Sequence, residues 1–425
     1  MLPRPEGTAS LSEMAGTSPA MTAMKAPMSV SLPAHLRAIL DAAIPRFSAA
    51  EMARRRAAIE ALLAQAQCDH LLFCGANRFG SAVQWLTQWP VTAEAVGVLT
   101  PGMRDALFVQ YVNHAPQASL VADKADVAWG GESSIAAAIE VLKKRGAREN
   151  RVATLGPVSA DQYASLSAKF GKLKNMNRDY IRLRQVKSAE EIDWLRIGAH
   201  FSDLGMMALR DAIKPGISER ELGNAVERAY VGFGGTTGIH YIGTTSMAAP
   251  DLAVPRQFAT PRKVQTGDVV VAEITAAFWE HPGQVLRSFA LGQPTPLYRD
   301  LHAAADSAFD AVAAVLKAGA TPAQVIEASG VIEDKGFTIV DDLLHGYGGG
   351  YLPPILGAKS RPSGPVPQEP FRAGQVVVIQ PNVVTPDRKA GVQTGEMVLI
   401  TEAGVERFHN FPRGLAIRRH PEVRA

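Results

Sequence analysis

The stretch "DVVVAEITAAFWEHPGQVLRSFALG", from Asp268 to Gly292, decides the fold. Its opening run of apolar and β-branched residues is typical of a buried strand. A second apolar run, "QVLRSFALG", follows the turn "WEHPGQ" and predicts a return strand. This pair would bury the carboxyl group of Glu273 and bring the neutral amide of Gln284 alongside it. Since burying polar groups costs free energy unless they are partnered, both residues indicate a functional site.

Length and composition narrow the class of protein. The chain has 425 residues, of which 47% are hydrophobic, so it can bury a large core in two or three domains. The net charge of +3 comes without a basic stripe, and we expect no nucleic-acid partner. Two cysteines without metal-ligand spacing indicate reduced thiols. No apolar run suits a membrane span or a signal peptide, which favours a cytoplasmic location without membrane association.

The pattern along the chain predicts two folded domains after a leader. Residues 1–32 are rich in Pro, Ser, Thr and Gly and contain several Met residues, which is typical of a disordered leader and leaves the true start open. Residues 33–180 alternate helical and strand patterns, which predicts an α/β domain. Residues 181–425 group helices between paired strands, which predicts an α+β domain. Serine–glutamate pairs three residues apart, such as Ser188 and Glu191, predict capped helix starts.

Further polar residues interrupt the apolar runs of the second half. His345 precedes the glycines of "HGYGGGYLPP", where backbone can approach a ligand closely. Gln380 and Asn382 interrupt the strand pattern "GQVVVIQPNVV". Glu396 is the second residue of the next strand pattern, "GEMVLITEAGVERF". A histidine can move protons near neutral pH, and amides can donate as well as accept hydrogen bonds.

These motifs, in this order, resemble the creatinase/aminopeptidase P superfamily. The segments "RLRQVKSAEEIDWLR", "IKPGISEREL", "TGDVVVAEITA", "HGYGGG" and "VVVIQPNVV…TGEMVLITEAGVERF" carry the resemblance, from about residue 182 to 412. It implies a pita-bread catalytic domain of the α+β class behind an α/β N-terminal domain. It also implies a homodimer in which the N-terminal half helps to close the pocket across the interface.

The resemblance breaks down at the metal ligands. Peptidases of the superfamily hold two metal ions through Asp, Asp, His, Glu and Glu. At those positions this chain has Glu273, Gln284, His345, Gln380 and Gly395, with Glu396 next in sequence. Amide oxygens are weaker ligands than carboxylates, so we expect no metal and no other cofactor.

Creatinase is then the better guide within the superfamily. The resemblance implies a metal-independent enzyme that acts on a small organic molecule by C–N hydrolysis or by lyase-type elimination. The expected catalytic residues are His345, Glu273 and Glu396, and the expected substrate-binding residues are Gln284, Arg287, Gln380, Asn382, His240, Tyr241, Tyr347 and Tyr351.

Two other functions stay open. One is an Xaa-Pro dipeptidase-like metallopeptidase, or a metal-dependent lyase, with an unusual ligand set. The other is a binding protein that keeps the peptidase fold without catalysis. Structural roles also stay open for individual residues: Glu273 could pair with Arg287, and Glu396 could be an acid facing solvent at a strand end. His281 is expected to be exposed in its turn.

Overall fold

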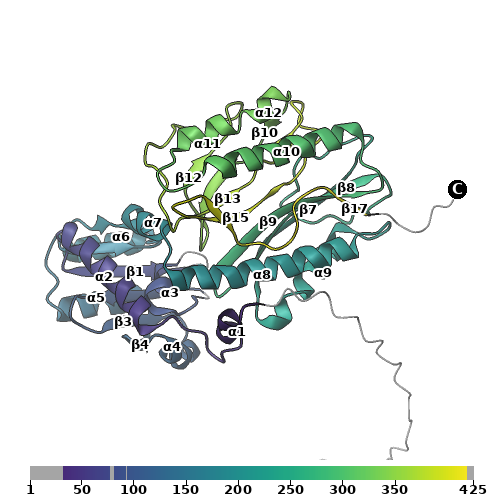
Figure 1. Cartoon of the computed structure of the whole chain (residues 1–425). Coiled ribbons are helices and arrows are strands. Elements are labelled where there is room, and N and C mark those ends of the chain that lie inside the picture. The colour runs from purple at the N-terminus through teal and green to yellow at the C-terminus, as the bar shows by residue number, and fades with distance from the viewer. Residues whose placement is uncertain (1–31, 77–80, 92, 419–425) are drawn as a thin grey trace, which may run out of the picture. The chain divides into compact units, whose positions relative to one another are not determined.

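The computed structural model describes residues 32–76, 81–91 and 93–418 (Figure 1). The expected leader therefore lies, except for its last residue, outside the described residues. The elements up to residue 185 are α1 (Ala34–Leu40), α2 (Ala49–Gln65), β1 (His70–Gly75), α3 (Ala82–Thr87), β2 (Ala95–Leu99), β3 (Asp105–Val109), η1 (Val112–His114), α4 (Ala115–Val121), β4 (Ala125–Trp129), α5 (Ser134–Lys144), β5 (Val152–Leu155), α6 (Ala160–Phe170), β6 (Lys174–Asn175) and α7 (Asn177–Gln185).

The N-terminal half is an α/β structure, as the sequence predicts. Its six-stranded sheet has the order β4-β3-β2-β1-β5-β6 and mixes parallel with antiparallel pairs. Apolar residues of α2, α3 and α4 pack on one face, and those of α5 and α6 pack on the other. Both faces of the strands are therefore buried, which explains why β1, "HLLFCG", is apolar almost throughout.

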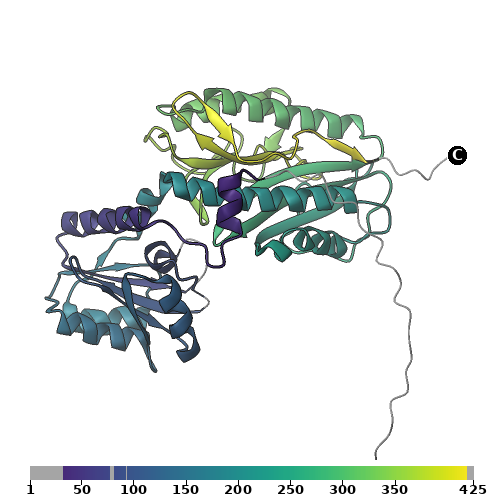
Figure 2. The same cartoon turned by 60° about the horizontal axis from the view of Figure 1, so that its bottom comes forward.

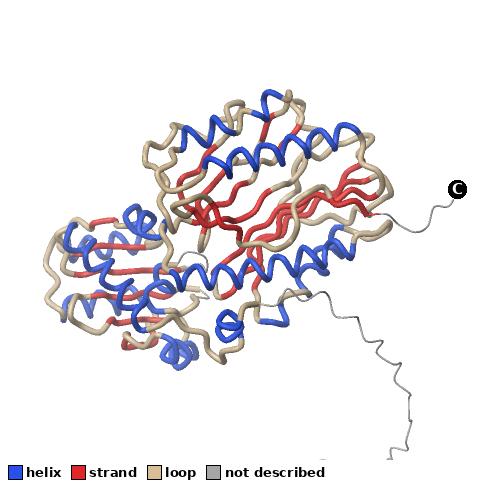
Figure 3. The backbone as a smooth tube through the Cα atoms, viewed as in Figure 1, coloured by secondary structure: helices blue, strands red, loops and turns tan. Residues whose placement is uncertain are grey.

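The remaining elements form the C-terminal half (Figure 3). They are α8 (Ala189–Ala212), α9 (Glu219–Arg228), η2 (Val231–Phe233), β7 (Thr236–Ser246), β8 (Asp268–Phe278), β9 (His281–Leu291), α10 (Pro296–Val315), α11 (Pro322–Ala328), α12 (Val331–Asp334), β10 (Thr338–Ile339), β11 (Leu344–Tyr347), β12 (Tyr351–Leu356), β13 (Val376–Ile379), β14 (Val383–Val384), β15 (Gly395–Ile400), β16 (Val405–Arg407) and β17 (Ala416–Arg418).

A nine-stranded sheet organises this half. Its path runs β12-β11-β13-β15-β9-β8-β7, with β16 on β15 and β17 on β9. Apolar residues of α8 and α9 pack on the outer face of β8 and β9, while α10, α11 and α12 pack on the outer face of β11, β13 and β15 (Figures 1 and 2). The inner face, which carries Glu273, is left for the site. This arrangement confirms the predicted pita-bread architecture of the C-terminal half.

The β8–β9 hairpin confirms the predicted strand pair but not its turn. The turn residues are Trp279 and Glu280, both with positive φ, and His281 already pairs with Phe278. The Pro-Gly sequence lies within β9 because Gly283 allows α8 to approach: a Cβ there would lie 2.2 Å from the Cα of Ala199. The hairpin register is thus set by helix packing rather than by turn-forming residues.

Most predicted helix starts are confirmed. Ser188 with Glu191 and Ser218 with Glu221 form reciprocal capping boxes at α8 and α9. The side chain of Ser48 caps α2 by accepting from the amide of Glu51. The backbone amide of Ser48 donates to Glu190, a residue of α8, rather than to Glu51. The start of α2 is therefore tied to the start of α8.

Two compositional expectations can be compared with the structure. Cys68 and Cys74 are buried free thiols. The helices of the described residues are all too short or too polar to span a lipid bilayer. The described residues form one compact unit. Helix α7 spans residue 180, near which the domain boundary is expected, so that boundary stays a prediction.

Candidate functional site

Four neighbouring strands carry polar side chains to one face of the sheet. In β8 and β9, Thr275 lies opposite Gln284, and the alternation of side chains places Glu273 on the same face. Across the sheet, the register of β13 with β11 and β15 places Gln380 and His345 on this face as well. We call this face the inner face. It gathers residues that lie more than a hundred positions apart in sequence.

An amide connects two of these side chains. The Nε2 of Gln284 donates to the Oε1 of Glu273 at 2.6 Å and to the Oε1 of Gln380 at 3.3 Å. Gln284 and Gln380 are fully buried, and Glu273 is 6% exposed. Burial, together with the negative charge of Asp341, raises the pKa of Glu273 to about 8. At neutral pH without a ligand, Glu273 is therefore mainly protonated.

His345 is held in one tautomer. Its Nδ1 donates to the carbonyl oxygen of Gly346 at 3.1 Å, which leaves Nε2 as a bare acceptor in the neutral ring. Burial lowers the pKa of His345 to about 4, so the ring is neutral at pH 7. The ring stacks on Tyr351 with centroids 3.7 Å apart, and Tyr347 packs edge-on at 5.4 Å. Both neighbours restrict the orientation of the imidazole.

Unpaired polar atoms mark this place in the fold. Among the described residues, four buried atoms here lack a well-formed hydrogen bond, namely the Oε1 of Gln284, the Nε2 of His345, the Nε2 of Gln380 and the Oγ1 of Thr275. Gln380 makes only weak contacts with His345 and Tyr351, and Thr275 makes one with Tyr347. Buried polar groups in proteins are nearly always hydrogen-bonded, because leaving one unpaired costs about 1–3 kcal/mol. A cluster of such atoms indicates a ligand-binding site.

Asp341 joins the site, and the sequence analysis missed it. It precedes β11, and its Oδ2 accepts from the Nδ2 of Asn382 at 3.4 Å. Asn382 follows β13 and reaches back through its own amide to the carbonyl of Gln380. Burial raises the pKa of Asp341, and its charge acts on Glu273. Asp341 lies in the bend before β11, where the alternation of strand residues does not apply, so the sequence pattern gave no signal for it.

The three predicted tyrosines differ in position. Tyr241 pairs directly with Glu273 across β7 and β8, which places it on the inner face. Tyr347 is buried, while Tyr351 is about half exposed. Burial raises the pKa of each phenol, so all three stay neutral and can donate hydrogen bonds near neutral pH. A role in substrate binding stays a prediction for them.

The structure contradicts the expected roles of Glu396 and Arg287. Glu396 pairs with Val285 in the sheet register, so it points to the outer face, and Gly395 takes the inner position. Its two oxygens accept from Arg287 and Arg407. The other N–H groups of Arg287 donate to the backbone carbonyls of Leu286, Gly395, Phe411 and Pro412. Glu396 therefore serves no catalysis at this face, and Arg287 has no donor left to bind a substrate carboxylate or to pair with Glu273.

Two histidines also differ from expectation. His240 lies on the strand face opposite to Tyr241, and its Nε2 contacts the hydroxyl of Tyr230 at 2.6 Å while Nδ1 contacts the carbonyl of Ile239. Both ring nitrogens are thus engaged away from the inner face. His281 is partly buried between Phe47 and Trp194 rather than exposed, because it belongs to β9.

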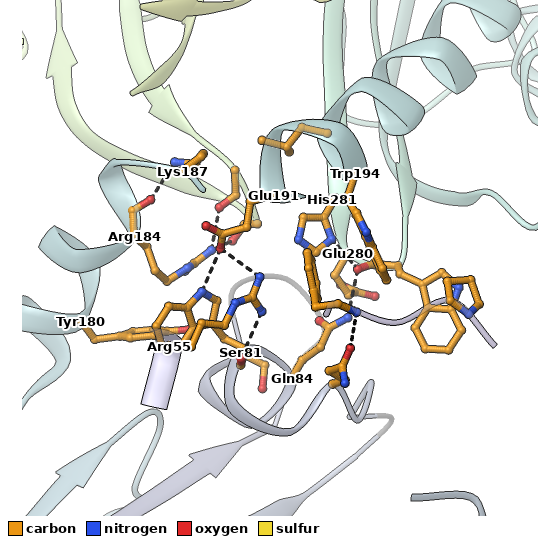
Figure 4. A pocket seen from close by; sticks show the side chains of 18 residues that line it. Arg55, Ser81, Gln84, Tyr180, Arg184, Lys187, Glu191, Trp194, Glu280 and His281 are labelled. Carbon is orange, nitrogen blue, oxygen red and sulfur yellow. Dashed lines mark hydrogen bonds and ion pairs between the residues drawn. The ribbon is translucent and has the colours of Figure 1, made fainter. Parts of the chain in front are cut away.

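A second polar pocket lies beside the glycines that follow His345 (Figure 4). Charged residues in its lining make contacts within the protein. Arg55 and Glu191 pair at 3.3 Å, and Trp85 also donates to Glu191. Lys187 donates to the carbonyls of Arg184 and Gln185. These contacts tie α2 and α3 to the start of α8, and we assign this pocket a structural role.

The donor set at the inner face does not fit the two-metal site of the superfamily. Within the described residues, no group of three or more His, Cys, Asp or Glu side chains is placed to hold a metal ion. Gln284 and Gln380 supply amides where carboxylates would stand, and Gly395 supplies no side chain. A Cβ on Gly395 would lie 2.8 Å from the Cα of Gln380, so a larger residue would not fit here without a shift. Neutral amides lack the charge that holds two dications together.

Comparisons with known proteins find similarity to peptidases. Residues 193–402 match metallopeptidase family M24. The chain is 25% identical over 250 residues to an Xaa-Pro dipeptidase of Pyrococcus furiosus, which covers 58% of this chain and 68% of the relative. It is 27% identical over 267 residues to an uncharacterized peptidase of Bacillus subtilis, covering 60% of this chain and 71% of that one.

Solved structures agree on the fold. An Xaa-Pro dipeptidase from Bacillus anthracis superposes with a TM-score of 0.75 at 19% identity, covering 86% of this chain and 100% of that chain. The prolidase from Pyrococcus furiosus superposes with a TM-score of 0.70 at 19% identity, covering 83% of this chain and 99% of that chain.

Proposed function

Because the chain belongs to the creatinase/aminopeptidase P superfamily and has its pita-bread fold, we propose that it is a hydrolase of short peptides, with Xaa-Pro dipeptides as the first substrates to test. The single structural observation that supports this proposal is the cluster of unpaired polar atoms on the inner face. Peptide groups carry both the donors and the acceptors that these atoms lack.

This proposal corrects the function expected from the sequence. We expected a metal-independent enzyme that acts on a small organic molecule by C–N hydrolysis or elimination. That expectation is wrong, because the matched family and the relatives are peptidases, two of them named Xaa-Pro dipeptidases. The altered ligands led the reasoning towards creatinase, whereas the similarity over the whole domain supports the peptidase alternative.

The inner face offers a complementary set of groups to a peptide. The bare Nε2 of His345 can accept a hydrogen bond or a proton from the reacting group. The Nε2 of Gln380 carries unused N–H donors that suit a carbonyl oxygen on which negative charge develops. The hydroxyl of Thr275 can donate or accept beside them. In this proposal water attacks the scissile carbonyl carbon, His345 takes a proton from that water and passes it to the leaving nitrogen, and Gln380 polarises the carbonyl oxygen.

Metal chemistry enters no step of this account, since the donor set does not fit two ions. The assay must therefore be run both without metal ions and with metal ions added. The other open function, peptide binding without catalysis, is an outcome of the same experiment. We also propose a homodimer, as the superfamily resemblance implies, and a cytoplasmic location, as expected from the sequence composition.

The proposed function predicts release of the C-terminal residue from dipeptides. The purified chain should be incubated with Ala-Pro, Met-Pro, Phe-Pro and Arg-Pro, and free proline measured, with Ala-Ala as the control for proline preference. Each reaction should be run after chelation and again with Mn²⁺, Co²⁺, Zn²⁺ or Mg²⁺ added. We expect proline release that His345→Gln removes. Saturable binding of these dipeptides without release in every condition would leave a binding protein and contradict the hydrolase.

A further inference from the structure

We propose that Asp341 is a second acidic substrate-binding residue, which together with Glu273 holds the protonated amino terminus of the peptide. This inference rests on the proposed function and deepens it. Asp341 lies outside every position that the sequence analysis singled out. The structure brings it to the inner face next to the unpaired atoms described above.

A chain of hydrogen-bonded groups joins the two acids. Glu273 accepts from the amide of Gln284, which also donates to Gln380. Gln380 is linked through its backbone carbonyl to Asn382, and the side chain of Asn382 donates to Asp341 at 3.4 Å. These groups come from β8 and β9 and from the segments next to β11 and β13.

The unpaired atoms indicate the chemistry of the group that belongs there. The Oε1 of Gln284, whose amide contacts Glu273, is an acceptor without a donor. With the carboxyl groups of Glu273 and Asp341, this end of the site offers hydrogen-bond acceptors that can carry negative charge. A group with several N–H donors matches this set, and an ammonium group has three donors and no acceptor.

The charged residues around the site also favour a bound ammonium group. Arg287 lies on the outer face with all its donors used. Arg361 donates to Asp342, which directly follows Asp341, at 3.2 Å. The negative charge of Asp341 adds to the cost of ionising Glu273. A bound ammonium group would relieve this repulsion.

Aromatic rings complete the surroundings. Tyr241 lies opposite Glu273 in the strand register, and the rings of Tyr347 and Tyr351 pack edge to face with centroids 6.3 Å apart. The faces of aromatic rings attract cations as well. A peptide bound by its amino terminus at this end places its first peptide bond further along the inner face, where His345 and Gln380 lie.

Asp341→Asn tests this assignment with little change of shape. The asparagine oxygen can still accept from the amide of residue 342, a bond that measures 2.8 Å in the native chain. We expect KM for a dipeptide with a free amino terminus to rise about ten- to hundredfold, as for one lost charge-assisted hydrogen bond, with kcat within about threefold. The matched control is Asp342→Asn, which removes a neighbouring carboxylate bound to Arg361 and Ser363 and should change KM less than about threefold.

An N-acetylated dipeptide separates charge recognition from other effects. The native chain should bind the acetylated ligand more weakly than the free amine by a similar factor, and Asp341→Asn should erase that difference in calorimetry. The binding measurement does not depend on turnover. If dipeptides are not cleaved but the free-amine preference disappears in Asp341→Asn, the subsite stands and the hydrolase proposal fails. If dipeptides are cleaved and Asp341→Asn keeps the native KM and preference, the subsite is wrong and the hydrolase stands.

Discussion

Replacing His345 by alanine is expected to lower kcat/KM for dipeptide hydrolysis by about 10²–10⁴-fold, the range typical of a removed group that transfers protons. The reason is geometric. The ring is buried, its Nδ1 is fixed by the carbonyl of Gly346, and its Nε2 is a buried acceptor on the inner face beside the neutral amide of Gln380. His240, the other histidine expected at the site, lies on the opposite face of β7.

The measurement needs controls for packing, because His345 stacks on Tyr351. His345→Gln retains most of the volume and a polar tip, and it should lose nearly as much activity as the alanine variant. His35→Ala, at an exposed histidine beside Asp193, should leave activity unchanged. Circular dichroism and the melting temperature report on folding. Activity of His345→Gln within about threefold of the native chain would remove His345 from the mechanism.

Replacing Arg287 by methionine is expected to lower the free energy of unfolding by about 3–5 kcal/mol, since one partner of a buried ion pair is lost. The guanidinium group holds Glu396 and the carbonyls of Phe411 and Pro412, so it ties the segment after β16 to β9 and β15. Burial would favour the neutral form of Glu396, but hydrogen bonds from Arg407 and the charge of Arg287 lower the pKa of Glu396. Without Arg287, the ionised carboxylate of Glu396 loses one of its two arginine partners and keeps Arg407.

Urea denaturation followed by fluorescence checks this expectation. Arg196→Met is the matched control, because its ion pair with Glu406 lies at the surface, where such pairs contribute roughly 0–1 kcal/mol. A loss below about 1 kcal/mol in Arg287→Met, equal to the control, would show that the network does not stabilise the fold.

The strand pattern of the second half was readable from the sequence, and its turn was not. Apolar and β-branched residues from Asp268 onwards predict the buried strand, and the structure confirms it. The turn falls at Trp279 and Glu280, which lack the Asn or Gly residues favoured at positive φ. Gln84, a residue of α3, donates to the carbonyl of Trp279, so a distant contact helps to fix it. Such contacts leave no local signal in a sequence.

Part of the site was also predictable. Glu273, Gln284, Gln380 and His345 share the inner face, as expected from buried polar residues in apolar strands. Glu396 was assigned by its closeness to Gly395 in sequence, although a period of two places adjacent strand residues on opposite faces. Asp341 lies before the first residue of β11, in a bend, so no strand pattern pointed to it. The function was missed because the changed ligands were given more weight than the similarity of the whole domain.

The most direct test of the account is a crystal structure of the native chain with a dipeptide analogue that resists cleavage, such as a reduced-amide Ala-Pro isostere. The account predicts that the analogue lies on the inner face, with its amino group within hydrogen-bond distance of Glu273 and Asp341. The same density should place its former peptide bond beside the Nε2 of His345 and the Nε2 of Gln380. Density for the analogue only outside this face, or binding that leaves those atoms without a ligand contact, would contradict the assignment of this site.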